Sequence, residues 1–154
     1  AQDHKRVLEG DKGKNTGGMG AYSPSNLINN ELEEKIIKKI IEPTLKGLTE
    51  LGTKYKGFLY VGLMIIKNEP YLIEYNVRMG DPECQTILPL LNSDIVDIFT
   101  ACVKQNLHEV KIEWSEKKSV CVVLCVVGCL CCYSQKEYEP NQEGETEEIP
   151  AAVF

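Results

Sequence analysis

Apolar residues recur at spacings of three and four between residues 31 and 51, a pattern typical of a helix with one buried face. The stripe consists of Leu32, Ile36, Ile37, Ile40, Ile41, Leu45 and Leu48. Asn29 or Asn30 can cap the start of this helix, and Gly52 stands where a helix commonly ends. Pro43 lies inside the range, so we expect the helix to kink or to divide there.

A predicted hairpin follows this helix. Residues 58–66 form a continuous apolar run that predicts a buried strand, residues 67–69 predict a turn, and residues 71–78 predict a returning strand. Because side chains alternate between the two faces of a strand, the second strand divides into two sets. The set expected to face the core is Tyr71, Ile73, Tyr75 and Val77. The other set is Leu72, Glu74, Asn76 and Arg78.

The remaining segments complete an α+β pattern. Five closely spaced glycines predict that residues 10–26 form a loop. A short helical stretch around Pro89 precedes a helix from about Ser93, its expected cap, to Asn106. The inner face of that helix is expected to contain Ile95, Ile98, Phe99, Cys102 and Val103.

Two segments remain beyond that helix. Residues 118–127 predict a third strand, and the Glu-rich residues 135–148 predict a linker or loop. Strands joined by a hairpin, with helices between the others, favour an α+β fold in which helices flank an antiparallel sheet.

Composition and charge exclude several classes of protein. The chain has 154 residues, 43% of them apolar, and a net charge of −6. Of its 17 basic residues only Arg6 and Arg78 are arginines, so it is a poor candidate for binding nucleic acid or an anionic membrane. The longest apolar run, residues 120–130, is too short to cross a bilayer. We therefore expect neither nucleic acid nor a membrane among its partners.

The seven cysteines indicate a reducing compartment. Their number is odd and their spacing does not resemble a secreted disulfide framework, so we expect free thiols and a cytoplasmic protein. A zinc or iron–sulfur site is disfavoured because no second ligand cluster accompanies the group Cys121, Cys125, Cys129, Cys131 and Cys132. Cys84 has no candidate base beside it in the sequence, so we do not interpret it as a nucleophile.

The second hairpin strand carries the first candidate site. Glu74, Asn76 and Arg78 place a carboxylate, an amide and a guanidinium in a row, with steps of about 6–7 Å. Oxygen ligands suit Mg²⁺, and an arginine can bind a phosphate or carboxylate through two parallel hydrogen bonds. A solvent-facing sheet surface is the alternative. Residues 79–83, Met-Gly-Asp-Pro-Glu, favour a site, because a plain surface strand needs neither the tight bend nor two more carboxylates.

The second candidate is the glycine-rich segment of residues 15–24, Asn-Thr-Gly-Gly-Met-Gly-Ala-Tyr-Ser-Pro. It matches neither a P-loop, which needs Lys-Ser/Thr after its glycines, nor the G-x-G-x-x-G pattern. Glycines let backbone N–H groups approach an anion closely, so the segment can bind a phosphate or a carboxylate. A flexible connector is the alternative, because glycine clusters commonly mark plain loops.

Together these segments resemble one family, the phosphoribosylamine–glycine ligases. Residues 2–6, 15–24 and 73–83 occur in that family in the same order and spacing, and the resemblance extends from residue 1 to about Val127. It implies an ATP-grasp fold, in which two α+β lobes hold ATP between them, and it implies that this chain is the second, C-terminal lobe. The implied domains are the second half of the ATP-grasp domain, residues 1–115, and the truncated start of a C-terminal domain, residues 116–154.

The resemblance also implies roles for individual residues. Glu74 and Asn76 would bind the Mg²⁺ or Mn²⁺ that bridges the ATP phosphates. Arg78 and Asp81 would be catalytic. The residues implied in binding glycine and phosphoribosylamine are Arg78, Gly80 and Asp81, with Asp3, Gly17, Gly18, Met19 and Gly20 closing over them. The implied reaction activates glycine with ATP as an acyl phosphate, and the amine of phosphoribosylamine then displaces phosphate, which gives glycinamide ribonucleotide for purine biosynthesis.

The resemblance further implies that this chain is one portion of a longer protein. The missing N-terminal domain and first lobe would supply the adenine pocket and the lysine that grips the ATP phosphates. Two alternatives stay open: another ATP-grasp carboxylate–amine ligase, and a non-catalytic remnant that folds as a lobe and binds partners. The intact motif residues argue against the remnant.

Overall fold

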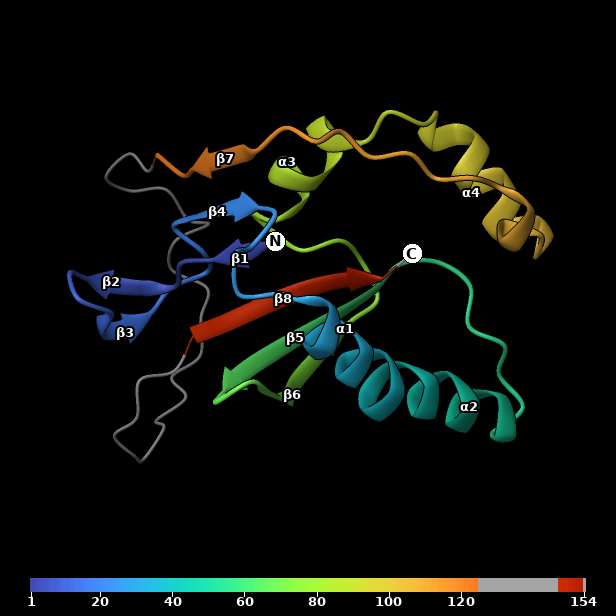
Figure 1. Ribbon diagram of the computed structural model, residues 1–154, viewed down its shortest axis with the longest axis horizontal. Helices are drawn as coiled ribbons and strands as arrows, with labels where there is room; N and C mark the ends of the chain where they lie inside the picture. The colour runs from blue at the N-terminus through green and yellow to red at the C-terminus, as the bar shows by residue number, and fades with distance from the viewer. Residues whose placement is uncertain (125–146, 154) are drawn as a thin grey trace.

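The computed structural model describes residues 1–124 and the backbone of residues 147–153 (Figure 1). Its strands form antiparallel sheets, with helices packed beside them. One sheet has the order β1-β4-β7, formed by Gln2–Asp3, Gly20–Ser23 and Ser119–Val122. A second pairs β2 with β3, Arg6–Leu8 with Lys12–Asn15. The third has the order β6-β5-β8, formed by Glu69–Asn76, Leu59–Ile66 and Glu147–Val153. The predicted α+β class is confirmed.

The first long helix is divided, as predicted. It consists of α1 (Asn30–Ile36), the π-helical turn η1 (Ile37–Ile41) and α2 (Glu42–Glu50). The wide turn ends just before Pro43, which is the second residue of α2 and has no N–H to continue the hydrogen-bond ladder. The Asn29 side chain caps α1 by accepting a hydrogen bond of 2.8 Å from the backbone N–H of Leu32. Gly52 follows the end of α2 in a left-handed conformation, with φ +81°.

The main core lies between these helices and β5. Its buried members are Leu32, Ile36, Ile40, Ile41, Leu59, Val61 and Leu63. The hairpin from β5 to β6 turns on Lys67 and Asn68, both with positive φ, which suits a two-residue turn that follows the right-handed strand twist. The predicted turn was one residue longer, because Glu69 already pairs with Ile66.

A β-bulge changes which residues of β6 share a face. Gly62 pairs with Glu74, but the next residue of β5, Leu63, pairs with Leu72, so Ile73 is the extra residue. Leu63 belongs to the buried core, and directly paired residues share a face, so Leu72 lies on the core side and Glu74 on the opposite side. The prediction that Leu72 and Glu74 share a face is therefore wrong.

The apolar set of the second strand is also less buried than predicted. Tyr71 is 54% exposed, Ile73 48% and Val77 77%. β6 lies at the edge of its sheet, and the core cluster covers β5 instead. Only Tyr75 faces the helices closely enough for its hydroxyl to form a hydrogen bond with the hydroxyl of Thr44.

The glycine-rich region is more ordered than the predicted loop over residues 10–26. All of β3 and all of β4 lie within that range, and β4 is the central strand of its sheet. The loop prediction is therefore wrong for these residues, because β3 forms a hairpin with β2, and pairing of β4 with the distant β7 overrides the local glycine signal. The short helical stretch around Pro89 is confirmed as α3 (Cys84–Ile87) and the 3₁₀ turn η2 (Leu88–Leu90).

The later helix differs from the prediction at its cap and on its inner face. It runs as α4 (Ile95–Lys104), followed by η3 (Leu107–Glu109), and Asp94 is the cap, accepting a hydrogen bond from the N–H of Val96 at 2.8 Å. Ser93 instead accepts a hydrogen bond from the N–H of Glu113. Of the predicted inner face, Ile98 is buried but Phe99 and Val103 are exposed, because the main core lies elsewhere.

The third predicted strand is shorter than the range 118–127. Its described part is β7, Ser119–Val122, which pairs with β4. Residues 125–146 lie outside the described residues, and with them most of the predicted linker over residues 135–148. The last two residues of that range begin β8, which pairs with β5.

Ion pairs link the hairpin turn to the first helix. Glu69 contacts Lys35 at 2.8 Å and Lys39 at 2.6 Å, and Lys35 also contacts Glu31 at 2.9 Å. Hydrogen bonds from Lys35 and then from Lys39 lower the pKa of Glu69 from 4.5 to about 2. The charged form of Glu69 is therefore stabilised in the folded chain.

We expect Glu69→Gln to lower the melting temperature of this chain at pH 7. Because the pKa of Glu69 is depressed on folding, its contribution is complete above pH 4.5 and is lost as pH falls toward about 2. The difference in melting temperature between wild type and variant should therefore shrink across that window. Circular dichroism melts at pH 7, 4.5 and 3 measure this, and a difference that stays constant would contradict the prediction.

Candidate functional site

Glu74 and Asn76 lie at the end of β6 on one face of the sheet. The amide of Asn76 donates a hydrogen bond to Oε1 of Glu74 at 3.1 Å, so the two side chains converge. Opposite Glu74 stands Gly62, and a Cβ added there would come within 2.9 Å of Cγ of Glu74. The glycine inside an otherwise bulky strand therefore leaves room for the carboxylate side chain.

The pair fits a divalent cation that prefers oxygen ligands. A half-turn of the Asn76 amide places its oxygen where its nitrogen lies, 3.1 Å from the Glu74 carboxylate. Two adjacent ligands of an octahedral Mg²⁺ lie about 3 Å apart, given bonds of about 2.1 Å. Among the described residues no group of three or more His, Cys, Asp or Glu side chains could hold a metal. An ion here would thus take further oxygens from a ligand, as Mg²⁺ commonly does with phosphates.

The turn after β6 orients Arg78 and Asp81 differently. Arg78 is exposed, and its guanidinium donates a hydrogen bond to the carbonyl of Met79 at 2.8 Å. Asp81 is exposed as well, and its carboxylate accepts a hydrogen bond from the side chain of Gln85 at 2.9 Å. Both side chains are therefore accessible to a ligand.

Beneath this turn lies a buried carboxylate, Glu83, which the sequence marked as an extra carboxylate of the turn without assigning it a role. Glu83 is only 2% exposed, and Oε1 accepts a hydrogen bond from the hydroxyl of Tyr60 at 3.2 Å. Burial, followed by the adjacent charge of Glu83, raises the pKa of Tyr60 well above its usual range, and the charges of Glu74 and Asp3 add to this effect. Tyr60 thus stands among three carboxylates.

Gly80 allows the turn to approach this pair. A Cβ at Gly80 would lie 2.2 Å from Oε2 of Glu83 and 2.7 Å from the ring of Tyr60. Oε2 of Glu83 has no hydrogen-bond partner among the described residues. The glycine at position 80 is therefore required by close packing against a carboxylate.

Backbone hydrogen bonds hold the glycine-rich segment in place. The N–H of Met19 donates to the carbonyl of His4 at 2.8 Å, and the N–H of His4 donates to the carbonyl of Gly20 at 2.9 Å. The hydroxyl of Thr16 donates to the carbonyl of Lys5 and accepts a hydrogen bond from the N–H of Gly18. These contacts bind the segment to the end of β1, so it is not a flexible connector.

The same segment touches the turn after β6. Gly18 has φ +110°, and a Cβ added to it would lie 2.4 Å from Cδ of Pro82, 3.2 Å from Asp3 and 3.3 Å from the carbonyl of Asp81. Asp3 is buried, and Nζ of Lys5 lies 3.9 Å from its carboxylate. Residues about sixty positions apart in the sequence thus meet at Gly18.

The structure therefore brings most of the predicted site residues into one region. Asp3, Gly18, Gly80 and Asp81 lie close together, and Tyr60 connects Glu83 with the strand that carries Glu74. Gly17 and Met19 are exposed on the loop, and Gly20 is buried where β4 pairs with β7. Sequence reasoning missed the contributions of Tyr60 and Gly62, and it assigned no role to Glu83. The isolated glycine within the buried strand, opposite Glu74, was the available signal.

Comparison with known proteins identifies the family. The model of the phosphoribosylglycinamide synthetase ATP-grasp (A) domain matches residues 1–84, which is more than half of the chain. The chain belongs to this family. It therefore contains part of an ATP-grasp domain, and the residues that meet around Gly18 and Glu74 are part of that matched region.

Curated relatives of this ATP-grasp chain are phosphoribosylamine–glycine ligases. The enzyme of Chlorobaculum tepidum is 50% identical over 128 residues, which cover 83% of this chain and 30% of the relative. The chloroplastic enzyme of Arabidopsis thaliana is 44% identical over 155 residues, which cover 99% of this chain and 29% of the relative. The chain thus spans about 30% of the length of these relatives.

A solved structure agrees with the assignment to the ATP-grasp family. The crystal structure of phosphoribosylamine–glycine ligase from Thermotoga maritima matches with a TM-score of 0.65 and 38% identity, over 85% of this chain and 32% of that one. In the described part of the ATP-grasp chain, no helix has both the length and the apolar character needed to cross a membrane.

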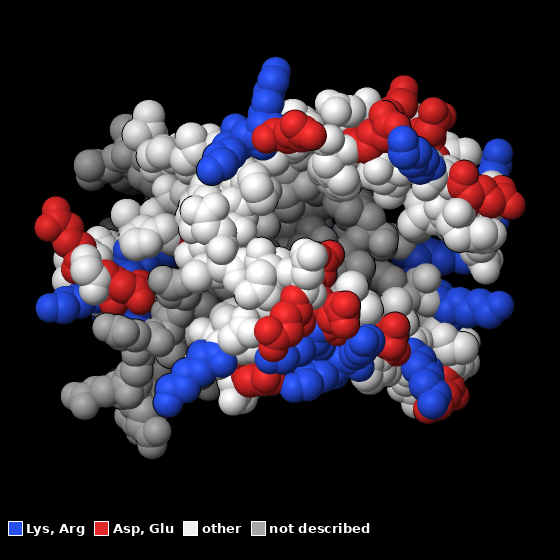
Figure 2. Space-filling view, in the orientation of Figure 1, with Lys and Arg blue, Asp and Glu red and all other residues white. Residues whose placement is uncertain are grey.

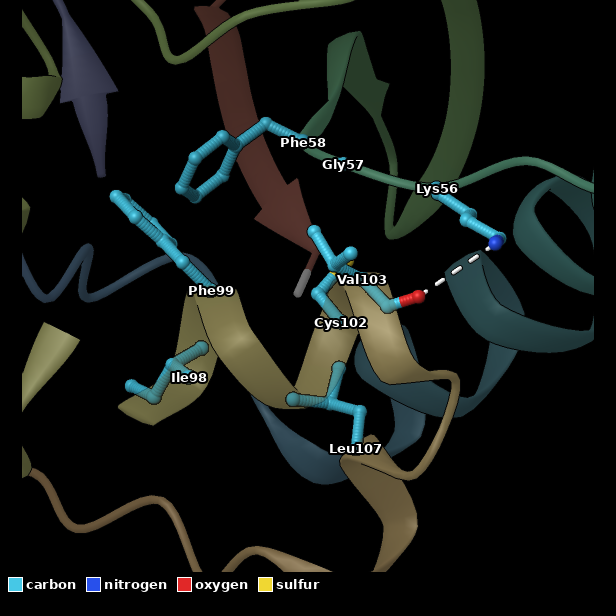
Figure 3. Close-up of a pocket in the computed structure, with 8 residues that line it drawn as sticks. All are labelled: Lys56, Gly57, Phe58, Ile98, Phe99, Cys102, Val103 and Leu107. Carbon is cyan, nitrogen blue, oxygen red and sulfur yellow. Dashed lines mark hydrogen bonds between the residues drawn. The ribbon is translucent and has the colours of Figure 1, made fainter. Parts of the chain in front are cut away.

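A hollow in the described part of the ATP-grasp chain lies away from these residues. It has a volume of about 320 Å³, and Figure 3 shows its apolar side chains from α4 facing Phe58. Its lining consists of Lys56, Gly57, Phe58, Ile98, Phe99, Cys102, Val103 and Leu107. None of these is a predicted site residue. The rings of Phe58 and Phe99 meet edge to face at 5.4 Å.

Surface charge and the cysteines add little to the site. On the face shown in Figure 2, basic and acidic side chains are interspersed along α1 and α2, as on an ordinary solvated helix surface.

Cys84, Cys102 and Cys121 are free thiols, and burial raises the pKa of Cys84, which makes it a poorer nucleophile. Cys125 and Cys129–Cys132 lie outside the described residues.

Proposed function

We propose that the longer protein containing this chain ligates glycine to phosphoribosylamine at the expense of ATP, through a glycyl phosphate, in purine biosynthesis. The observation that carries this is the meeting of the glycine-rich segment at Gly18 with the Arg78–Glu83 turn, beside the Glu74–Asn76 pair. These are the segments that resemble the ligase family, and the two curated relatives described above are 50% and 44% identical to this chain. The proposed location of this protein is the cytoplasm, a reducing compartment in which the thiols of Cys84, Cys102 and Cys121 would stay free.

In this proposal, each group at the site has a distinct task. A glycine carboxylate oxygen attacks the γ-phosphorus of ATP and releases ADP, and the amine of phosphoribosylamine then attacks the acyl carbon and releases phosphate. The exposed guanidinium of Arg78 binds an anionic group, and Asp81 accepts a hydrogen bond from an amine or hydroxyl of a substrate. Asp3 and the loop of Gly17, Gly18, Met19 and Gly20 close the site beside Gly80. Positioning of the reactants is the main contribution of such a site.

Glu74 and Asn76 would hold the Mg²⁺ or Mn²⁺ of the reaction. After a half-turn of the Asn76 amide, the oxygens of the two side chains would lie at the spacing that one ion requires, on an accessible face of the sheet. The ion would neutralise charge on the ATP phosphates. Of the side chains that face this position, the carboxylate of Glu74 provides the negative charge, and Gly62 leaves it the space to move toward an ion.

We also propose that this chain is the second, C-terminal lobe of the ATP-grasp domain. The proposed boundaries are residues 1–115 for the second half of that domain and residues 116–154 for the start of a C-terminal domain. The first lobe and the N-terminal domain of the same protein would then be its partners, together with ATP, glycine and phosphoribosylamine. The coverage of about 30% of the curated relatives supports the presence of further parts in the longer protein.

The direct test is an assay of the longer protein for ADP release. Release that depends on both glycine and phosphoribosylamine, with glycinamide ribonucleotide detected by mass spectrometry, is the expected result. Release that another carboxylic acid supports better than glycine would indicate a different ATP-grasp ligase. No ADP release with any carboxylic acid, from a protein that is folded, would indicate a non-catalytic remnant.

We expect residues 1–154 alone to form no ADP above background. ATP-grasp chemistry takes place between two lobes, and a single lobe leaves the ATP phosphates without half of their ligands. The measurement compares ADP release by the isolated chain with release by its Glu74→Ala variant under the same conditions. Glycine-dependent release by the isolated chain, abolished in that variant, would contradict the prediction.

A further inference from the structure

Tyr60 and Glu83 link two parts of the site that are otherwise separate. Tyr60 lies on β5 directly opposite Asn76, so its ring occupies the sheet face that carries the Glu74–Asn76 pair. Its hydroxyl reaches Glu83 at 3.2 Å, beneath the turn that follows β6. This hydrogen bond therefore joins the strand face to the turn.

Glu83 is itself held firmly from the other side. Its carbonyl accepts hydrogen bonds from the N–H groups of Thr86 and Ile87, at 2.9 and 3.0 Å, and from the hydroxyl of Thr86 at 2.8 Å. These bonds anchor Glu83 to α3, while its carboxylate packs against Gly80 in the space where a Cβ would lie. A shift of the Glu83 side chain would therefore displace Gly80 and the neighbouring Asp81.

Both members of the pair are too buried to bind a substrate. Tyr60 is 4% exposed and Glu83 is 2% exposed, and the packing of Gly80 against both covers them. A buried carboxylate is costly unless its hydrogen bonds are made, so the bond from Tyr60 fixes which way the Glu83 side chain points. Burial and a fixed hydrogen bond suit Tyr60 and Glu83 to holding other residues in position.

We propose that Tyr60 and Glu83 are positioning residues that align the Glu74–Asn76 pair with Gly80 and Asp81. The inference rests on the proposed ligase function, because the aligned residues are its proposed metal-binding and substrate-binding groups. Tyr60 keeps the strand face at a fixed distance from the turn, and the backbone hydrogen bonds of Glu83 hold the turn against α3.

The test uses Tyr60→Phe and Glu83→Met in the longer protein. Tyr60→Phe keeps the ring that packs on Gly80 and removes only the hydroxyl, and Glu83→Met keeps the length of the side chain and removes the acceptor. We expect each to lower kcat by about 10- to 100-fold, the loss that a small misplacement of reacting groups produces, with the KM for glycine changed less than about 3-fold. Glu83→Gln keeps an acceptor oxygen and should retain kcat within about 3-fold.

Coupling between the two positions can be read from the melting temperature, which does not depend on activity. The double variant Tyr60→Phe/Glu83→Met removes the same hydrogen bond as either single change. Its loss of melting temperature should therefore be less than the sum of the two single losses, and its fold-loss of kcat less than their product. Tyr71→Phe is the matched control, because Tyr71 is exposed on the same hairpin. It should leave kcat and melting temperature unchanged.

Several outcomes would overturn the alignment role. They are a wild-type kcat in Tyr60→Phe, losses in the double variant that add fully, and a Tyr60→Phe protein that does not fold at all, which would make the pair a folding requirement. If wild-type protein shows no glycine-dependent ADP release, the proposed function fails instead, and coupling in the melting temperatures still reports whether Tyr60 and Glu83 interact.

Discussion

Glu74→Gln and Glu74→Asp are each expected to lower the turnover of the longer protein by about 100-fold or more. The first change keeps the shape of the side chain and removes its charge. The second keeps the charge and shortens the reach by one methylene, which matters because Mg²⁺ is strict about ligand distance at about 2.0–2.1 Å. The measurement is kcat from ADP release at saturating ATP and glycine, with the Mg²⁺ concentration varied.

The control for Glu74 must be a glutamate without structural partners. Glu69, in the same hairpin, is unsuitable because it forms ion pairs with Lys35 and Lys39. Glu116 is exposed on a bend before β7, and Glu116→Gln should keep turnover within about 2-fold, as expected for a surface substitution. Turnover of Glu74→Gln equal to that of Glu116→Gln would remove Glu74 from the proposed metal site.

Gly18→Ala is expected to damage both stability and activity. The positive φ of Gly18 costs a residue with a Cβ about 1–2 kcal/mol, and the new Cβ would lie 2.4 Å from the ring of Pro82. Overpacking of this kind adds about 1–3 kcal/mol. We therefore expect a loss of about 2–5 kcal/mol in the free energy of unfolding, measured by urea denaturation, and at least a 10-fold loss of turnover in the longer protein, because the loop must move away from Asp81.

Gly10→Ala separates backbone strain from collision. Gly10 also has a positive φ, +69°, but nothing lies within 4 Å of a Cβ added to it. Its replacement should cost only the conformational term of about 1–2 kcal/mol, with turnover little changed. If Gly18→Ala and Gly10→Ala show equal losses of unfolding free energy and of turnover, the contact between the glycine-rich segment and Pro82 does not contribute to function.

Structural features that depend on neighbouring residues were predicted correctly, and features that depend on distant residues were not. Asn29 caps its helix, Gly52 ends it, and the helix divides before Pro43, because each of these effects acts within a few residues. Where the predicted pattern relied on an uninterrupted alternation, as for Leu72 and Glu74, a single extra residue at Ile73 changed the outcome. Bulges are set by packing of the partner strand, which a single strand's sequence does not reveal.

For the site, the alternation of the strand was enough to predict that Glu74 and Asn76 share a face, since they stand two residues apart on the same side of the bulge. The sequence also marked the glycines and the Asp81-Pro82 bend as unusual. The meeting of Gly18 with Pro82 and the hydrogen bond from Tyr60 to Glu83 became visible only in the folded chain. Those contacts join residues 23 or more positions apart, and they depend on how β5, β6 and the glycine-rich segment pack together, which no local periodicity encodes.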